Sequence, residues 1–69
     1  MSIRELLNKK GKKYHIDVEI TETNIILDKV YRIEKLEDKE FYLIDNYNDP
    51  IMSSSTIEDC FNYYVNTYV

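Results

Sequence analysis

Apolar residues recur at helical spacing near both ends of the chain. The first such stretch, residues 2–10, precedes Gly11, and glycine is the residue that most often follows the last turn of a helix. Residues 2–5 and 55–58 both have the S-x-x-E pattern, in which a serine and a glutamate cap backbone N–H groups at a helix start. A short first helix of roughly nine residues is therefore predicted. Its apolar members are Ile3, Leu6 and Leu7.

The C-terminal stretch, residues 55–69, predicts an amphipathic helix with one broad apolar stripe. The three- and four-residue spacing places Tyr64 and Tyr68 toward the core and leaves Tyr63 on the outer side. The stripe consists of Ile57, Cys60, Phe61, Tyr64 and Tyr68.

Between these helices the apolar residues alternate with polar ones, as they do in half-buried strands. Residues 14–21 alternate without a fault and predict the first strand. Residues 24–36 are rich in β-branched side chains and predict a second strand, with a bulge near Asp28. A hairpin turn at residues 36–40 leads to a third strand at 41–45. A polar loop at 46–50 and a brief extended piece at 51–52 complete the chain before the second helix.

These elements predict a single small α+β domain over residues 1–69. It contains a short N-terminal helix, a three-stranded antiparallel meander and the C-terminal amphipathic helix. A small five-stranded SH3-like barrel with a C-terminal helix is the alternative, because residues 29–45 resemble the hairpins of such barrels. Tyr42 and Ile44 are expected on the outer sheet face, only partly covered, where they form a possible second interface, including one between two copies.

The charges are unevenly distributed along the chain. Thirteen acidic and nine basic residues give a net charge of −4, and four lysines fall within residues 9–13. Residues 40–69 contain five acidic residues and no lysine or arginine. An acidic half of this kind repels nucleic acid and attracts a basic protein surface. We therefore expect a protein partner, and neither direct nucleic-acid binding nor a membrane.

Residues with catalytic potential are few and are predicted to lie apart. His15 and Cys60 are the only histidine and cysteine; the pattern places the first on a polar strand face and the second on the buried helix stripe. Gly11 is the sole glycine, so no phosphate-binding loop is present. No enzymatic activity, cofactor or metal is expected. A lone cysteine and a codon usage rich in A and T point to the reducing cytoplasm of a bacterial host, infected by a phage.

The first twenty residues and the hairpin segment 32–45 resemble the small acidic anti-CRISPR proteins that Listeria phages use against Cas9. The resemblance rests on Met1, Ile3, Leu6, Leu7, Lys13 and Tyr14, on the isoleucine-rich strands, and on Phe61 in the last helix. The lysine cluster and the aromatic last helix depart from that family. The resemblance implies a non-enzymatic inhibitor that blocks a nucleic-acid groove, such as that of a CRISPR nuclease, with its carboxylates.

The residues expected to bind such a partner are acids of residues 40–69 and the two tyrosines among them. The alternative function is a small structural or interaction module, or a homodimeric accessory subunit. The predicted partner-binding residues are Asp45, Tyr47, Asp49, Glu58, Asp59 and Tyr63.

Overall fold

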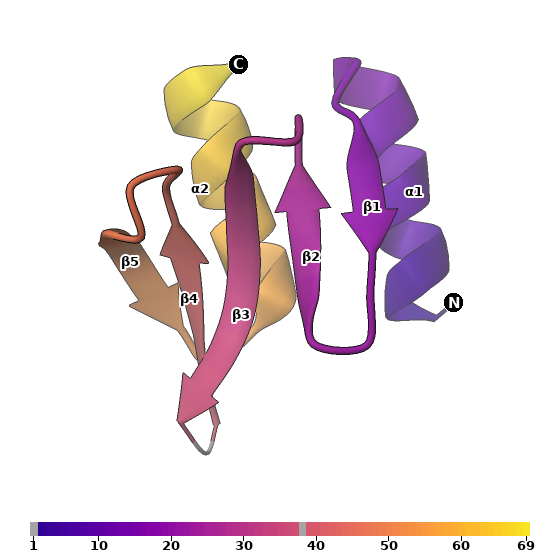
Figure 1. Ribbon diagram of the computed structural model, residues 1–69. Helices are drawn as coiled ribbons and strands as arrows, with labels where there is room; N and C mark the ends of the chain where they lie inside the picture. The colour runs from indigo at the N-terminus through magenta and orange to yellow at the C-terminus, as the bar shows by residue number, and fades with distance from the viewer. Residues whose placement is uncertain (1, 38) are drawn as a thin grey trace.

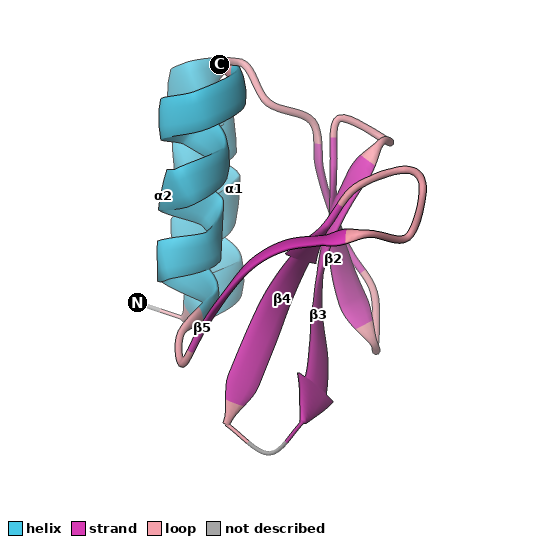
Figure 2. Cartoon of the chain, turned by 90° about the vertical axis from the view of Figure 1, so that its left-hand side faces the viewer, coloured by secondary structure: helices cyan, strands magenta, loops and turns pink. Residues whose placement is uncertain are grey.

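The computed structural model describes residues 2–37 and 39–69, with Glu37 described by its backbone only. Five antiparallel strands form one sheet in the order β1-β2-β3-β4-β5, and both helices pack on one face of it (Figure 1, Figure 2). The elements are α1 (Ile3–Tyr14), β1 (Val18–Ile20), β2 (Asn24–Leu27), β3 (Tyr31–Glu37), β4 (Glu40–Ile44), β5 (Pro50–Ser54) and α2 (Ile57–Tyr68).

The α+β class is confirmed, but the expected three strands are wrong because the sheet has five. The sheet is open, with β1 and β5 at its two edges, so it is not the barrel considered as the alternative.

Helix α1 begins as predicted and ends later than predicted. Ser2 caps it, since its Oγ accepts a hydrogen bond of 3.2 Å from the Glu5 backbone N–H. The helix continues through Gly11 to Tyr14, and His15, with φ of 60°, adopts the left-handed conformation that ends it. The alternation in residues 14–21 therefore overstated the first strand, because its first residue belongs to the helix.

Gly11 is buried inside the helix because the chain returns across it. A Cβ atom at this position would lie 2.7 Å from Cγ2 of Val18 and 3.0 Å from the carbonyl oxygen of Ile16. The absence of a side chain lets α1 approach the start of β1 closely. Gly11 thus serves helix–strand packing, and the prediction that it ends the helix is wrong.

The predicted second strand is in fact two strands joined by a tight turn. Asp28 and Lys29 have φ of 54° and 61°, the positive values that a type I′ hairpin turn requires at both central positions. The Asp28 side chain also accepts a 2.9 Å hydrogen bond from the Asp17 backbone N–H, which ties the turn to the segment before β1. The predicted bulge is therefore a chain reversal.

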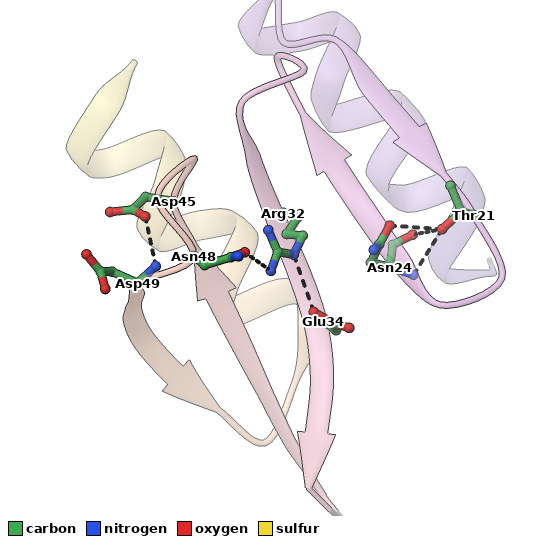
Figure 3. Close-up of polar contacts among 7 residues, drawn as sticks. All are labelled: Thr21, Asn24, Arg32, Glu34, Asp45, Asn48 and Asp49. Atoms are coloured by element: carbon green, nitrogen blue, oxygen red, sulfur yellow. Dashed lines mark hydrogen bonds and ion pairs between the residues drawn. The ribbon is translucent and has the colours of Figure 1, made fainter.

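The remaining connections follow the sequence pattern more closely. Strands β3 and β4 form a hairpin as predicted, but β3 extends to Glu37 and β4 begins at Glu40, so the turn is shorter than the predicted residues 36–40. Lys39 in this turn has φ of 71°, and Asp38 lies outside the described residues. The extended piece predicted at 51–52 is the centre of a full strand, β5, in which Met52 pairs with Leu43. The β1–β2 turn is closed by Thr21 and Asn24, whose side chains share a 2.9 Å hydrogen bond (Figure 3).

Helix α2 is capped by Thr56, one residue after the predicted cap at Ser55. The Thr56 side chain accepts a 3.2 Å hydrogen bond from the Asp59 backbone N–H. Its inner face buries Cys60, Phe61 and Tyr64, as predicted. Tyr68, expected near the core, is 44% exposed, which is more than the 38% of Tyr63. Tyr68 is the last residue of α2 and is half-exposed, although one face of its ring stacks on Tyr31.

The core lies between the two helices and the inner face of the sheet. Ile44, expected to be partly covered on the outer face, is only 3% exposed, so that expectation is wrong; Tyr42 is half-buried. Ile44 lies opposite Arg32 in the β-ladder, and Arg32 reaches the loop that follows Ile44, so the chain itself supplies neighbours on this face. The core residues are Leu7, Ile16, Ile25, Leu27, Ile33, Leu43, Cys60, Phe61 and Tyr64.

Candidate functional site

The loop between β4 and β5, residues 45–49, holds three of the six predicted binding residues. Asp45 organises it, because its Oδ1 accepts a 2.8 Å hydrogen bond from the backbone N–H of Tyr47. The same oxygen accepts a 2.9 Å hydrogen bond from the backbone N–H of Asp49 (Figure 3). This is the local side-chain-to-backbone bonding by which aspartate shapes turns. The result is a fixed loop in which the Tyr47 side chain is 79% exposed between two carboxylates.

Two more predicted residues, Glu58 and Asp59, lie in the first turn of α2. The Asp59 carboxylate accepts a 2.8 Å hydrogen bond from the Ser54 hydroxyl, so it helps to hold the end of β5 against the helix start. Glu58 pairs with Lys10 of α1 at 3.2 Å, and Lys10 also donates to Asn62 at 2.9 Å. These two acids therefore bind within the protein.

The structure does not bring all six residues together. In Figure 1, strand β5 lies between the 45–49 loop and the start of α2. The five residues of Pro50–Ser54 span about 17 Å at the usual rise of ~3.3 Å per residue. The candidate surface is thus divided into a loop group and a helix-start group.

Tyr63 lies on α2 and is 38% exposed. The pKa of the nearby Tyr68 is raised, with desolvation as the largest cause, followed by the neighbouring Tyr31. Asp45 follows Ile44, which pairs with Arg32, so Asp45 lies next to Tyr31 where the β3–β4 ladder ends. The loop group therefore adjoins the end of β3 that holds Tyr31, and Tyr63 is a separate exposed tyrosine on α2.

Two basic residues from the first half of the chain reach residues of the second half, and one of them pairs with an acid there. Arg32 forms an ion pair of 3.3 Å with Glu34 and donates a hydrogen bond to Asn48 in the loop (Figure 3). Lys10 reaches Glu58 in the same way. The expectation that no base weakens the field of residues 40–69 holds along the sequence and fails in the fold.

An aromatic cluster that the sequence did not single out lies beside the loop group. The rings of Tyr31 and Tyr68 stack, with centroids 4.8 Å apart, and Tyr64 lies 5.1 Å from Tyr31 and 5.6 Å from Tyr68. The Tyr64 hydroxyl donates to Asp28, so the β2–β3 turn is tied to α2. Tyr64 and Tyr68 are four residues apart on one helix face, which is the signal by which part of this cluster could have been found.

The two residues with catalytic potential are far from a nucleophile–base arrangement. Cys60 is fully buried, its thiol faces the Phe41 carbonyl at 3.5 Å, and burial, followed by Asp59 and Glu40, raises its pKa to about 11. His15 is exposed at the end of α1. Over residues 2–37 and 39–69, no group of three histidine, cysteine or acidic side chains is arranged to hold a metal ion.

Two shallow hollows are also present. One lies between α1 and the approach to β1, lined by Asn8, Lys12 and His15 among others. The other is mainly apolar and lies at the opposite end of the helices, lined by Ile3, Phe41 and Ile57 with the β1–β2 turn. Neither contains any of the predicted partner-binding residues.

Comparison with known proteins found no matching protein family, no matching curated protein and no matching solved structure. The resemblance to anti-CRISPR proteins therefore stays a prediction. In the part of the chain that the structure describes, neither helix has the length and apolar character needed to cross a membrane.

Proposed function

We propose that this protein is a non-enzymatic inhibitor, encoded by a phage or mobile element, that acts in the cytoplasm of a bacterial host. It binds a basic nucleic-acid-binding effector, such as a CRISPR nuclease, and occupies the groove that the nucleic acid needs. The observation that carries this proposal is the fixed 45–49 loop, which presents a 79% exposed tyrosine between two carboxylates.

Physical arguments support this surface as a protein-binding site. An exposed tyrosine offers a large amphipathic contact area with little rotamer entropy to lose, and tyrosines are enriched among the residues that dominate interfaces. The Asp45 hydrogen bonds hold the loop before any partner arrives, so little backbone ordering remains to oppose association. The nearby carboxylates attract a surface that is lined with arginine and lysine for phosphates.

The division of the predicted residues ranks them for this role. Asp45, Tyr47 and Asp49 lie in the loop group and, together with the exposed Tyr63 of α2, are proposed as the primary contact. Glu58 and Asp59 lie at the far end of β5 and hold internal bonds, so they contribute to the general negative field.

The test is a binding comparison between matched charge reversals. Asp49→Lys changes an exposed side chain, whereas the loop bonds of Asp49 are made by its backbone N–H and carbonyl oxygen, so the fold is expected to survive. Glu19→Lys is the control, because Glu19 is exposed on β1 at the opposite edge of the sheet. Both variants change the net charge by the same amount.

We expect Asp49→Lys and Tyr47→Ala to weaken partner binding much more than Glu19→Lys does. We also expect wild-type binding to weaken steeply as salt rises, since exposed charges are screened. Equal losses in the two charge reversals would leave only a general effect of net charge and would remove the loop from the proposed site.

A second candidate function, a homodimeric or accessory interaction module, is favoured by the open edge at β5. Edge strands present unpaired backbone groups on which another chain can form a strand. Ser53 is exposed on this strand, and Ser53→Lys places a charge on the edge. Sedimentation of both forms decides this alternative: a wild-type dimer that Ser53→Lys converts to a monomer supports it, and a wild-type monomer excludes the homodimer.

A further inference from the structure

The cluster of Tyr31, Tyr64 and Tyr68 has a closed base and an open side. Tyr64 is 3% exposed and forms the base, whereas Tyr68 is 44% exposed. The Tyr31 and Tyr68 rings stack at 4.8 Å with an interplanar angle of 30°, so their facing sides cover each other and the aromatic surface at the end of α2 is the other side of the half-exposed Tyr68 ring. Burial in the core explains the position of Tyr64. It does not explain why Tyr31 and Tyr68 stack where Tyr68 is open to solvent.

Negative charge surrounds this open side. Tyr68 is the last residue of α2, where unpaired carbonyl groups give the helix end a partial negative charge. The last turn of α2 has no basic residue to compensate for it. Asp45 follows Ile44, which pairs with Arg32, so it lies next to Tyr31 across the β3–β4 ladder. Both of its loop hydrogen bonds use Oδ1, which leaves Oδ2 for another donor.

The chain's own cation–π contacts lie elsewhere. Within the described residues, Lys13 lies 5.3 Å from the centroid of the Tyr14 ring, and Lys35 lies 5.9 Å from that of Phe41. Arg32 contacts the 45–49 loop, and its guanidinium donates hydrogen bonds to Glu34 and Asn48. The stacked tyrosines thus combine an aromatic face with negative charge, and no cation–π contact from a basic side chain of the described residues covers them.

We propose that Tyr31, Tyr68 and Asp45 form a binding site for one guanidinium group, the side chain of an arginine on the protein's partner. The negative ring faces attract a cation, and the planar guanidinium stacks on a tyrosine better than an ammonium does. The Asp45 carboxylate accepts a hydrogen bond from the same group. This inference rests on the proposed function in one respect: that function supplies the protein partner that carries the arginine.

The site can be tested without any partner. N-acetyl-arginine amide is titrated into the protein while the ring resonances of Tyr31 and Tyr68 are followed by NMR. N-acetyl-citrulline amide, which has nearly the same shape and no charge, is the matched probe. We expect saturable shifts at these two rings with the arginine compound, with an affinity at least severalfold higher than for the citrulline compound.

Variants locate the effect. Tyr68→Leu keeps an apolar side chain at a half-exposed position and should weaken arginine binding by roughly three- to tenfold. Asp45→Asn should weaken it severalfold while keeping an oxygen for the loop bonds, whereas Tyr42→Leu, on the outer sheet face, should leave it unchanged. Shifts that do not saturate, that are equal for the two probes, or that persist in Tyr68→Leu would overturn the proposal.

The two proposals fail separately. If arginine amide does not bind but the protein still displaces nucleic acid from its partner, the arginine site is wrong and the proposed function stands. If arginine amide binds as expected and nucleic acid is not displaced, the site stands and the inhibitory function is wrong.

Discussion

Replacing Gly11 by alanine tests whether this glycine ends the helix or allows close packing of α1 on β1. On an exposed helix surface this change stabilises a protein by up to about 1 kcal/mol, because alanine is the better helix former. Here the new Cβ would lie 2.7 Å from a Val18 methyl group and 3.0 Å from the Ile16 carbonyl oxygen. The methyl group can turn aside, but the carbonyl oxygen belongs to the backbone that leads into β1.

Forcing one extra methyl group into a packed site costs about 1–3 kcal/mol, which exceeds the gain in helix propensity. We therefore expect Gly11→Ala to lose roughly 1–2 kcal/mol of unfolding free energy. In a domain of this size, that loss lowers the melting temperature by about 5–15 °C. Urea denaturation followed by circular dichroism measures the free energy, and a thermal scan gives the temperature.

Asn8→Ala is the control for helix propensity, because Asn8 is exposed in the same helix and should gain a few tenths of a kcal/mol at most. Adding Val18→Ala to Gly11→Ala should recover part of the loss, through removal of the closer contact. A Gly11→Ala protein that is more stable than wild type would refute the close approach of α1 to β1.

Three further predictions concern the core. Tyr64→Phe removes the hydrogen bond to Asp28 and should cost about 1–3 kcal/mol in urea denaturation, with an unchanged fold. Phe61→Ala should cost about 3–5 kcal/mol and in so small a domain can unfold it, whereas Tyr63→Ala, at a 38% exposed position, should cost much less. Burial raises the pKa of Cys60 from 9.0 to about 11, so the unfolded thiol ionises first as pH rises. Its contribution to stability is therefore complete below pH 9 and lost between pH 9 and about 11, and Cys60→Ala should lack this part of the alkaline destabilisation.

Local patterns predicted the elements that depend on local physics. The Ser2 cap, the β3–β4 hairpin and the buried side of α2 follow from side-chain spacing and capping chemistry, and the structure confirms each. These features need information from only a few neighbouring residues. The sequence therefore predicted the fold class well.

The errors arose where distant residues decide the outcome. Gly11 reads as a helix end until Val18 and the Ile16 carbonyl are known to pack on it. Likewise, Asp28 and Lys29 reverse the chain although lysine seldom adopts positive φ, and the Asp28 bond to the Asp17 backbone holds the turn. Neither contact can be predicted from the neighbouring residues in the sequence.

The partner-binding residues stay a prediction, and their arrangement in space could not be predicted from the sequence. Spacing along the chain could not show that β5 separates the 45–49 loop from the start of α2. It also could not show that Arg32 reaches Asn48 and that Lys10 reaches Glu58, through side-chain contacts made only in the folded state. The placement of Tyr31 against Tyr68 depends on the same long-range packing.

The proposed function is tested most directly by competition for a nucleic-acid groove. A partner is first captured from host lysate with wild-type protein, and a Cas9–guide RNA complex is the first purified candidate. Binding of the partner to its own DNA or RNA is then measured at low salt with saturating wild-type protein, and again with Asp49→Lys and Glu19→Lys. We predict that wild type and Glu19→Lys displace the nucleic acid and that Asp49→Lys does so much less well. Nucleic acid that stays bound while saturating wild-type protein occupies the partner would contradict the account.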